Sequence, residues 1–333
     1  MVIIESYPLA VILCLVTMLC WGSWANTQKL AGKGWRFQLF YWDYAIGVML
    51  LSLIMAFTAG SFGTAGRPFL ADLGQASTSA IGFAILGGVV FNLSNILFVA
   101  AIDIAGMAVA FPIAVGLALV VGVITNYISR PEGNPALLFA GLLGVVIAIL
   151  LDAAAYRRLS TDKKETAKGV YISIIAGIAM GFFYRFVVKA MAANFAQPEQ
   201  GLMTPYTAVV FFSVGLLLSN FVLNSIVMAK PFTGEPVPYK DYFRKGTPRL
   251  HMIGILGGVI WNIGMSMSII ASGAAGPAIS YGLGQGATMV AAFWGVFIWR
   301  EFQKAPKGVN KLLTSMFVSF IVGLGLIIAA RLV

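Results

Sequence analysis

The apolar residues of this chain form ten blocks that follow one another along its whole length with only short polar breaks. A helix that crosses the apolar core of a bilayer needs about 20 residues, and each block is close to that length. Backbone groups inside a bilayer must bond within their own segment, so such blocks form helices. The sequence therefore predicts an all-α integral membrane protein with ten transmembrane helices, over residues 8–28, 37–58, 80–101, 105–128, 135–152, 169–191, 205–228, 251–271, 276–299 and 311–331.

Composition leaves no room for a separate soluble domain. Hydrophobic residues make up 59% of the chain and charged residues 10%, whereas about a quarter of the residues in soluble domains are charged. The charge of +10 could indicate nucleic-acid binding, but its distribution argues for a role at the membrane surface. We therefore expect membrane lipid, and no nucleic acid, as a partner.

Lysine and arginine are concentrated in the loops after the odd-numbered spans. The opposite loops hold only Arg67, Arg130, Lys189 and Arg331, and Arg185 lies inside a span. Basic loops of membrane proteins face the cytoplasm. The sequence thus predicts a multi-pass protein of the cell membrane, inner or plasma membrane, with both termini outside the cytoplasm.

An octapeptide occurs twice, as "ILGGVVFN" at 85–92 and "ILGGVIWN" at 255–262. The match continues without a gap, since Ala105-Gly106 aligns with Ala275-Gly276 and Gly116 with Gly286. Each half then holds five spans, and an odd number makes the second half enter the membrane from the opposite side. We predict two inverted five-helix repeats, 1–155 and 169–333, joined by a cytoplasmic loop at 156–168. Inverted repeats are typical of secondary transporters, although a duplication can also serve packing alone.

The two parts of the octapeptide suggest different roles. Its glycines form small-x-x-x-small pairs that let helices approach closely. Asn92 and Asn262 lie near the middle of their spans, where their amides can bind a neutral hydrogen-bonding solute. Asn95 and Gln285 add two further amides at similar depth. The alternative for the asparagines is hydrogen bonding between helices, which contributes about 0.6 kcal/mol on average in membranes.

Two further stretches suggest a binding site. Pro112 and the glycine-rich "YGLGQG" at 281–286, which includes Tyr281 and Gly282, occupy matching positions of the two halves. Interrupted helices at such positions often mark a transporter site, and a tolerated kink is the alternative. The "CWGSWAN" stretch at 20–26 contains flat apolar side chains beside hydrogen-bonding groups, which suit a planar or ring-shaped solute. These side chains are Trp21, Ser23, Trp24 and Asn26.

Asp43 is an acidic residue inside a span, about six residues from its cytoplasmic edge. A charge at this depth costs about 2.5–3.5 kcal/mol on insertion scales. Asp43 is therefore a candidate for proton coupling, with sodium as the other ion to consider and Arg185 as a charge partner. The alternative is an interfacial residue supported by the neighbouring aromatic side chains.

Signatures of enzymes are missing from the sequence. It contains one histidine, His251, and we find no zinc-protease, Cys-x-x-Cys, Gly-x-Ser-x-Gly or P-loop motif. We expect no catalytic residue, no metal site and no cofactor.

Short motifs in consistent order resemble those of the ureide permeases, within the drug/metabolite transporter superfamily. They are "GSW" at Gly22–Trp24, "DY" at Asp43-Tyr44, and the Gly-Gly of the third span followed by "TNY" at Thr125–Tyr127. The resemblance implies a ten-helix fold and proton-coupled uptake of ureides, nucleobases or similar nitrogen heterocycles. The P-loop-like loop of plant members has no counterpart in 152–169.

The function expected from these features is secondary active transport of a small neutral polar metabolite by alternating access. Related branches of the superfamily carry monosaccharides of the ribose, glucose or rhamnose type, so a sugar permease is the alternative. A membrane receptor that does not transport, or a membrane-embedded enzyme, remains a further alternative.

Overall fold

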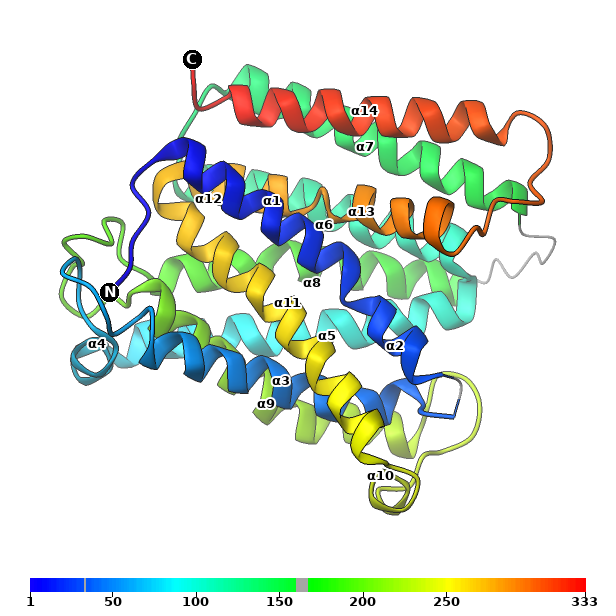
Figure 1. The fold of residues 1–333 in the computed structure, drawn as a ribbon, viewed down its shortest axis with the longest axis horizontal. Coiled ribbons are helices and arrows are strands. Elements are labelled where there is room, and N and C mark those ends of the chain that lie inside the picture. The colour runs from blue at the N-terminus through cyan, green and yellow to red at the C-terminus, as the bar shows by residue number, and fades with distance from the viewer. Residues whose placement is uncertain (33, 160–166) are drawn as a thin grey trace.

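The computed structural model describes residues 1–32, 34–159 and 167–333. Within these residues, ten helical segments are long and apolar enough to cross a membrane, which confirms the predicted all-α membrane fold (Figure 1). The helices are α1 Tyr7–Ser23, α2 Ala25–Ala31, α3 Phe37–Phe57, α4 Phe69–Gln75, α5 Thr78–Ala105, α6 Met107–Ser129, α7 Pro135–Leu159, α8 Ala167–Ala190, α9 Pro205–Ala229, α10 Lys240–Arg244, α11 Pro248–Ala275, α12 Pro277–Gly284, α13 Ala287–Phe293, the π-helical turn η1 Trp294–Ile298, and α14 Val309–Ala329.

The helices that contain the repeated octapeptide, α5 and α11, are built alike. Each has 28 residues. The side chain of Ser77 caps the start of α5 and that of Thr247 caps the start of α11. Each helix ends at a glycine with positive φ, 80° at Gly106 and 85° at Gly276, a conformation that favours glycine. The inverted relation of the two halves remains a prediction, and residues 160–166 of the predicted connecting loop lie outside the described residues.

Glycines let helices from different halves of the chain touch. A Cβ atom on Gly88 of α5 would lie 2.0 Å from the carbonyl oxygen of Phe212 in α9, and one on Gly258 of α11 would lie 2.0 Å from that of Tyr44 in α3. Two reciprocal contacts accompany them, Gly215 against Ile85 O and Gly47 against Ile255 O. The second glycine of each octapeptide therefore joins α5 to α9 or α3 to α11.

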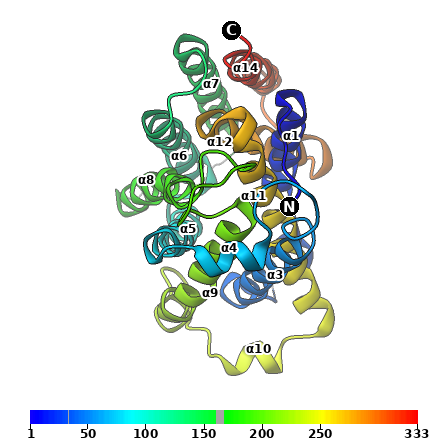
Figure 2. The same ribbon diagram turned by 90° about the vertical axis from the view of Figure 1, so that its left-hand side faces the viewer.

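The ends of the bundle differ. The N-terminus and α4 lie on the left in Figure 1, whereas α2 and α10 lie on the right, the side of the basic loops. α7 and α14 run side by side along one edge in both views (Figures 1 and 2).

The helix interruptions are not all where the sequence analysis placed them. Helix α6 continues through Pro112, so the prediction of a break there is wrong. Pro112 is the sixth residue of α6, so its missing N–H removes one bond inside the helix, and α6 accommodates this loss without ending. Gly282 lies within α12, and the interruption follows at Gln285–Gly286 before α13. The first span is divided at Trp24, between α1 and α2.

Candidate functional site

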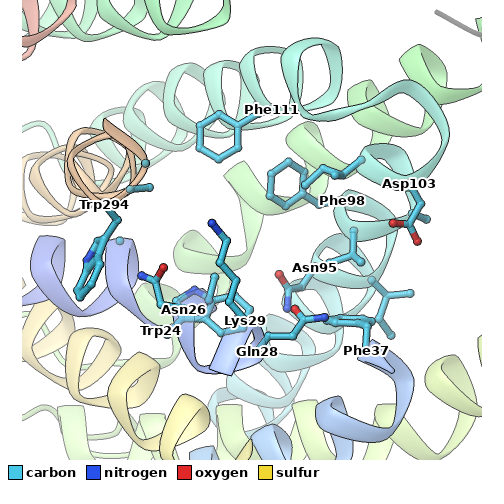
Figure 3. A pocket seen from close by; sticks show the side chains of 18 of the residues that line it. Trp24, Asn26, Gln28, Lys29, Phe37, Asn95, Phe98, Asp103, Phe111 and Trp294 are labelled. Carbon is cyan, nitrogen blue, oxygen red and sulfur yellow. The ribbon is translucent and has the colours of Figure 1, made fainter. Parts of the chain in front are cut away.

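A partly open cavity of about 780 Å³ lies in the half of the molecule that carries the basic loops. Ligand sites of proteins commonly have volumes of about 300–1,000 Å³. Aromatic rings and amides form much of its wall (Figure 3). Its aromatic residues are Trp24, Trp35, Phe37, Phe98, Phe111, Tyr156, Phe232, Trp294 and Trp299. Its amides are Asn26, Gln28, Gln38 and Asn95, and its charged residues are Lys29, Arg36, Asp103, Asp152 and Glu301.

The division of the first span at Trp24 brings Asn26 to the cavity wall, while Ser23 lies outside the lining and bonds to a residue of the wall. Trp294 Nε1 donates to Ser23 Oγ at 2.9 Å, and Trp299 Nε1 donates to Asn26 Oδ1 at 2.7 Å. The end of α1 and the start of α2 are thereby bonded to the segment around η1. Ser23 and Asn26 fix the orientation of two cavity indoles.

Asn95 and Trp24 contribute an amide and an indole to the wall. Asn95 Nδ2 donates to Tyr41 Oη at 3.1 Å, which fixes the orientation of the amide. Trp24 packs on Tyr44 with ring centroids 4.9 Å apart. Figure 3 shows Trp24 and Asn26 on one side and Asn95 beside Gln28 and Phe37 on the other. The cavity thus combines flat apolar faces with oriented hydrogen-bonding groups.

The repeated asparagines lie at helix contacts outside the cavity lining. Asn262 Nδ2 donates to Val48 O at 2.7 Å, while Asn92 Nδ2 donates to Ser219 Oγ at 2.8 Å and to Leu216 O at 3.3 Å. Both side chains are 0% exposed. The geometry therefore favours the alternative considered in the sequence analysis, bonding between helices.

Three more predicted site residues lie outside the lining. Trp21 stacks on Trp261, with centroids 6.0 Å apart. Tyr281 is fully buried and donates from its hydroxyl to Ala118 O at 3.1 Å. Gln285 is half-buried at the interruption after α12. Among the predicted residues, the cavity gathers Trp24, Asn26, Asn95 and Pro112.

Asp43 is 1% exposed and has partners that the sequence analysis did not identify. His251 Nδ1 lies 2.9 Å from Asp43 Oδ1, and Tyr242 donates its hydroxyl to the same oxygen. Burial and the adjacent carboxylate raise the pKa of Tyr242, so the phenol stays protonated and donates. The side-chain partners of Asp43 are therefore His251 and Tyr242, and not the predicted Arg185. This contact joins α3 to α10 and α11, and Asp43 is outside the cavity lining.

Asp152, Lys29 and Glu301 are charged cavity residues that the sequence analysis missed. Lys29 Nζ lies 3.0 Å from Glu301 Oε1, and Tyr156 donates to Glu301 Oε2 at 2.9 Å. The predicted fifth span ended at Asp152, whereas α7 continues to Leu159. The small apolar residues of "DAAAY" at 152–156 were the available signal for this longer helix.

The opposite end of the molecule is held closed by a buried ion pair. Arg67 Nη1 lies 2.9 Å from Asp72 Oδ1, and Asp72 Oδ2 accepts from the amide of Thr204 at 2.8 Å. Asp72 is completely buried. The space nearby between Met55, Pro205 and Tyr206 has no room for a water molecule. The two ends of the bundle thus differ in access to the interior.

Comparisons with known proteins agree with this architecture. The family model "Ureide permease" matches residues 40–170 and 156–330. Ureide permease 2 of Arabidopsis thaliana is 25% identical over 99% of each chain. Probable ureide permease A3 of Vigna unguiculata is 24% identical over 92% of this chain and 98% of its own length. Glucose uptake protein GlcU of Bacillus subtilis is 24% identical over 96% of this chain and 95% of its own.

One crystal structure of a protein shares the fold, with a TM-score of 0.60, 15% identity, and coverage of 98% of this chain and 99% of that one. The family model covers most of the chain, and the relatives are named as permeases and uptake proteins, not as enzymes. This chain is a multi-pass membrane protein that belongs to the ureide permease family.

Proposed function

We propose that this chain is a secondary active transporter that takes up a small neutral polar metabolite, of the ureide, nucleobase or similar nitrogen-heterocycle class. The proposal includes proton coupling and alternating access. The observation that carries it is the cavity, whose aromatic faces and amides suit a flat solute with several hydrogen-bonding groups.

Each feature of such a solute has a matching group in the cavity wall. The rings of Trp24, Phe98 and Phe111 offer flat surfaces. Asn26, Gln28 and Asn95 offer amide donors and acceptors, which suit the alternating N–H and C=O groups of ureides. Trp24, Asn26 and Asn95 are the predicted site residues that we retain for substrate binding.

Alternating access is supported by the difference between the two ends of the bundle. The cavity is open toward the basic loops, and the Arg67–Asp72 pair with Thr204 closes the other end. If the basic loops face the cytoplasm, this is an inward-open conformation with both termini outside. Opening of the other end then requires the contacts of Asp72 to separate.

The Asp43–His251 contact is suited to respond to this movement. It joins the first half of the chain to α10 and α11 of the second half, at the end where the cavity opens. In the proposal, this pair belongs to the contacts that change as that end opens and closes.

A monosaccharide is the second candidate substrate, because GlcU matches nearly the whole chain. Sugars also bind against aromatic rings through their apolar faces. The two classes differ in shape, since a heterocycle is flat and a pyranose is puckered.

A binding screen followed by transport separates the candidates. Thermal unfolding of the purified protein is measured with allantoin, uracil, glucose and ribose, because a ligand that binds the folded state stabilises it more as the ratio of its concentration to its Kd rises. Exchange of radiolabelled allantoin in proteoliposomes, with the unlabelled compounds as competitors, then tests transport. Competition by uracil and not by glucose supports the heterocycle. Competition by the sugars alone assigns the second candidate, and binding without exchange indicates a receptor.

A further inference from the structure

Asp152 is a buried carboxylate in the wall of the cavity. It lies in the last third of α7, its residue is 6% exposed, and it belongs to the cavity lining. Its Oδ1 atom is fully buried and has no hydrogen-bond partner in the part of the chain that the structure describes. A buried carboxylate oxygen without a donor or cation is costly, so this atom calls for a ligand.

The groups around Asp152 do not neutralise it. Its electrostatic neighbour Glu301 is also acidic and uses both oxygens for Lys29 and Tyr156. Helix α6, which packs against α7, contains no charged residue. The charged residue of α14 is the exposed Lys311.

The remaining charges on α7 lie beyond Tyr156. They are Arg157 and Arg158 in its last turn, and the guanidinium of Arg158 lies against Gly308. Two cations of the cavity have other partners, since Lys29 pairs with Glu301 and Arg36 Nη1 donates to Glu235 O at 2.6 Å. Asp103 is an exposed carboxylate. With Lys29 and Arg36 bonded to these other groups, Asp152 Oδ1 has no hydrogen-bond partner among the described residues.

The backbone around Glu301 is arranged to bring this second carboxylate close to α7. Arg300 adopts a φ of 52°, which is uncommon for a residue with a side chain. A Cβ on Gly295 of η1 would lie 2.7 Å from Tyr156 Oη. Strained backbone of this kind is often found at functional sites. The position of Glu301 beside Tyr156 thus depends on a strained turn and on a glycine.

We infer that the carboxyl group of Asp152, and not that of Asp43, binds the proton that is coupled to solute movement. This inference rests on the proposed transport function for its coupling role. Asp152 faces the solute cavity and has an unpartnered oxygen, whereas Asp43 is bonded to His251 and Tyr242 outside it. A proton from cavity water forms an O–H bond on Asp152 and removes its charge, and its release to water restores the carboxylate.

Transport in proteoliposomes tests the coupling. Radiolabelled allantoin is supplied under a gradient of about one pH unit, which supports up to about tenfold accumulation at a stoichiometry of one proton. Wild type should accumulate the label. Asp152→Asn should still exchange it at equal pH but reach an accumulation ratio near one, while Glu5→Gln, which changes an exposed carboxylate outside the cavity lining, keeps the wild-type ratio.

Three transport outcomes overturn the inference. One is an Asp152→Asn variant that retains the wild-type ratio. Another is loss of the ratio in Asp43→Asn alone. The third is accumulation driven by sodium and not by pH, with Asp152 required, which assigns the carboxylate to a sodium ion. If Asp152→Asn does not fold, Asp152→Glu decides: a shifted pH midpoint of accumulation supports the inference, and an unchanged midpoint contradicts it.

A second measurement does not depend on any solute. Infrared difference spectra of the full-length protein in detergent, recorded during a pH titration, should contain a carboxylic-acid band that Asp152→Asn or Asp152→Glu alters and Asp43→Asn leaves in place. Absence of the band in wild type, or its persistence unchanged in both Asp152 variants, overturns the proton site. Absence of allantoin or sugar exchange in a wild type that shows the band contradicts the transport proposal alone.

Discussion

The helix contacts that join α3 to α11 and α5 to α9 contain the same residue types as the cavity, in different surroundings. Asn92 and Asn262 are completely buried and bond to helix carbonyls and a serine. Asn26 and Asn95 line the cavity, and each is oriented by an aromatic partner. Residue type and depth alone therefore do not decide which amide meets a solute.

The ion pairs show the same contrast. The Asp72 side chain is 0% exposed and that of its partner Arg67 is 17% exposed. The side chains of Lys29 and Glu301 at the cavity are 48% and 32% exposed. We expect the buried groups to affect folding and the cavity groups to affect binding, and four pairs of variants test this difference.

The largest expected effect is the loss of the buried ion pair. Asp72→Ala leaves Arg67 and the Thr204 amide without their partner and should lower the free energy of unfolding by about 3 kcal/mol, since breaking a buried pair is costly. Glu301→Gln removes the solvated pair and should cost about 1 kcal/mol or less. Thermal unfolding in detergent compares the two. Equal changes would contradict the contrast between the regions.

A smaller loss is expected from filling a helix contact. Gly88→Ala places a methyl group 2.0 Å from Phe212 O and should destabilise the protein by about 1–3 kcal/mol, as overpacking does. Gly82→Ala in the same helix meets no atom within 4 Å, and it should stabilise by up to about 1 kcal/mol because alanine favours helix. Melting temperatures that move in the same direction would refute this prediction.

On the cavity side, Trp24→Ala should weaken solute binding by about tenfold, or 1.4 kcal/mol, because it removes a flat face of the wall. Trp24→Phe keeps an aromatic ring and should retain most of the affinity. Isothermal titration with the solute identified in the screen measures both. An affinity that is the same in all three proteins would exclude Trp24 from the binding surface.

The smallest effects separate the two kinds of asparagine. Asn262→Ala removes a buried bond to Val48 O and should lower stability by about 0.6 kcal/mol with unchanged solute affinity. Asn26→Ala should weaken binding, because it removes an amide from the cavity wall and frees Trp299. Stability and affinity are measured on the same samples. If Asn262→Ala weakened solute binding and Asn26→Ala left it unchanged, the hypothesis that the repeated asparagines bind the solute would be supported instead.

Much of the fold could be predicted because apolar length is a local property. A block of about 20 apolar residues forms a spanning helix wherever its neighbours lie. Capping residues and helix-ending glycines are also local, and Ser77, Thr247, Gly106 and Gly276 occur at matching positions of α5 and α11. The close-packing role of the octapeptide glycines was predicted on the same basis.

The candidate site was less predictable because it depends on which helices meet. Asp152 looked like the end of a span, and only the packing around α7 gives it a cavity to face. His251 and Asp43 are 208 residues apart in sequence, and no local pattern pairs them. Pro112 suggested a break from sequence, but α6 continues through it, and sequence alone does not tell whether packing will hold a helix together around a missing bond.

The sequence by itself determined a ten-helix membrane protein, the matched pair α5 and α11, and the family. The tertiary structure decided which polar groups face solvent and which are bonded inside. The reason is that a buried amide or carboxylate is defined by its partners, and these partners come from helices distant in the chain.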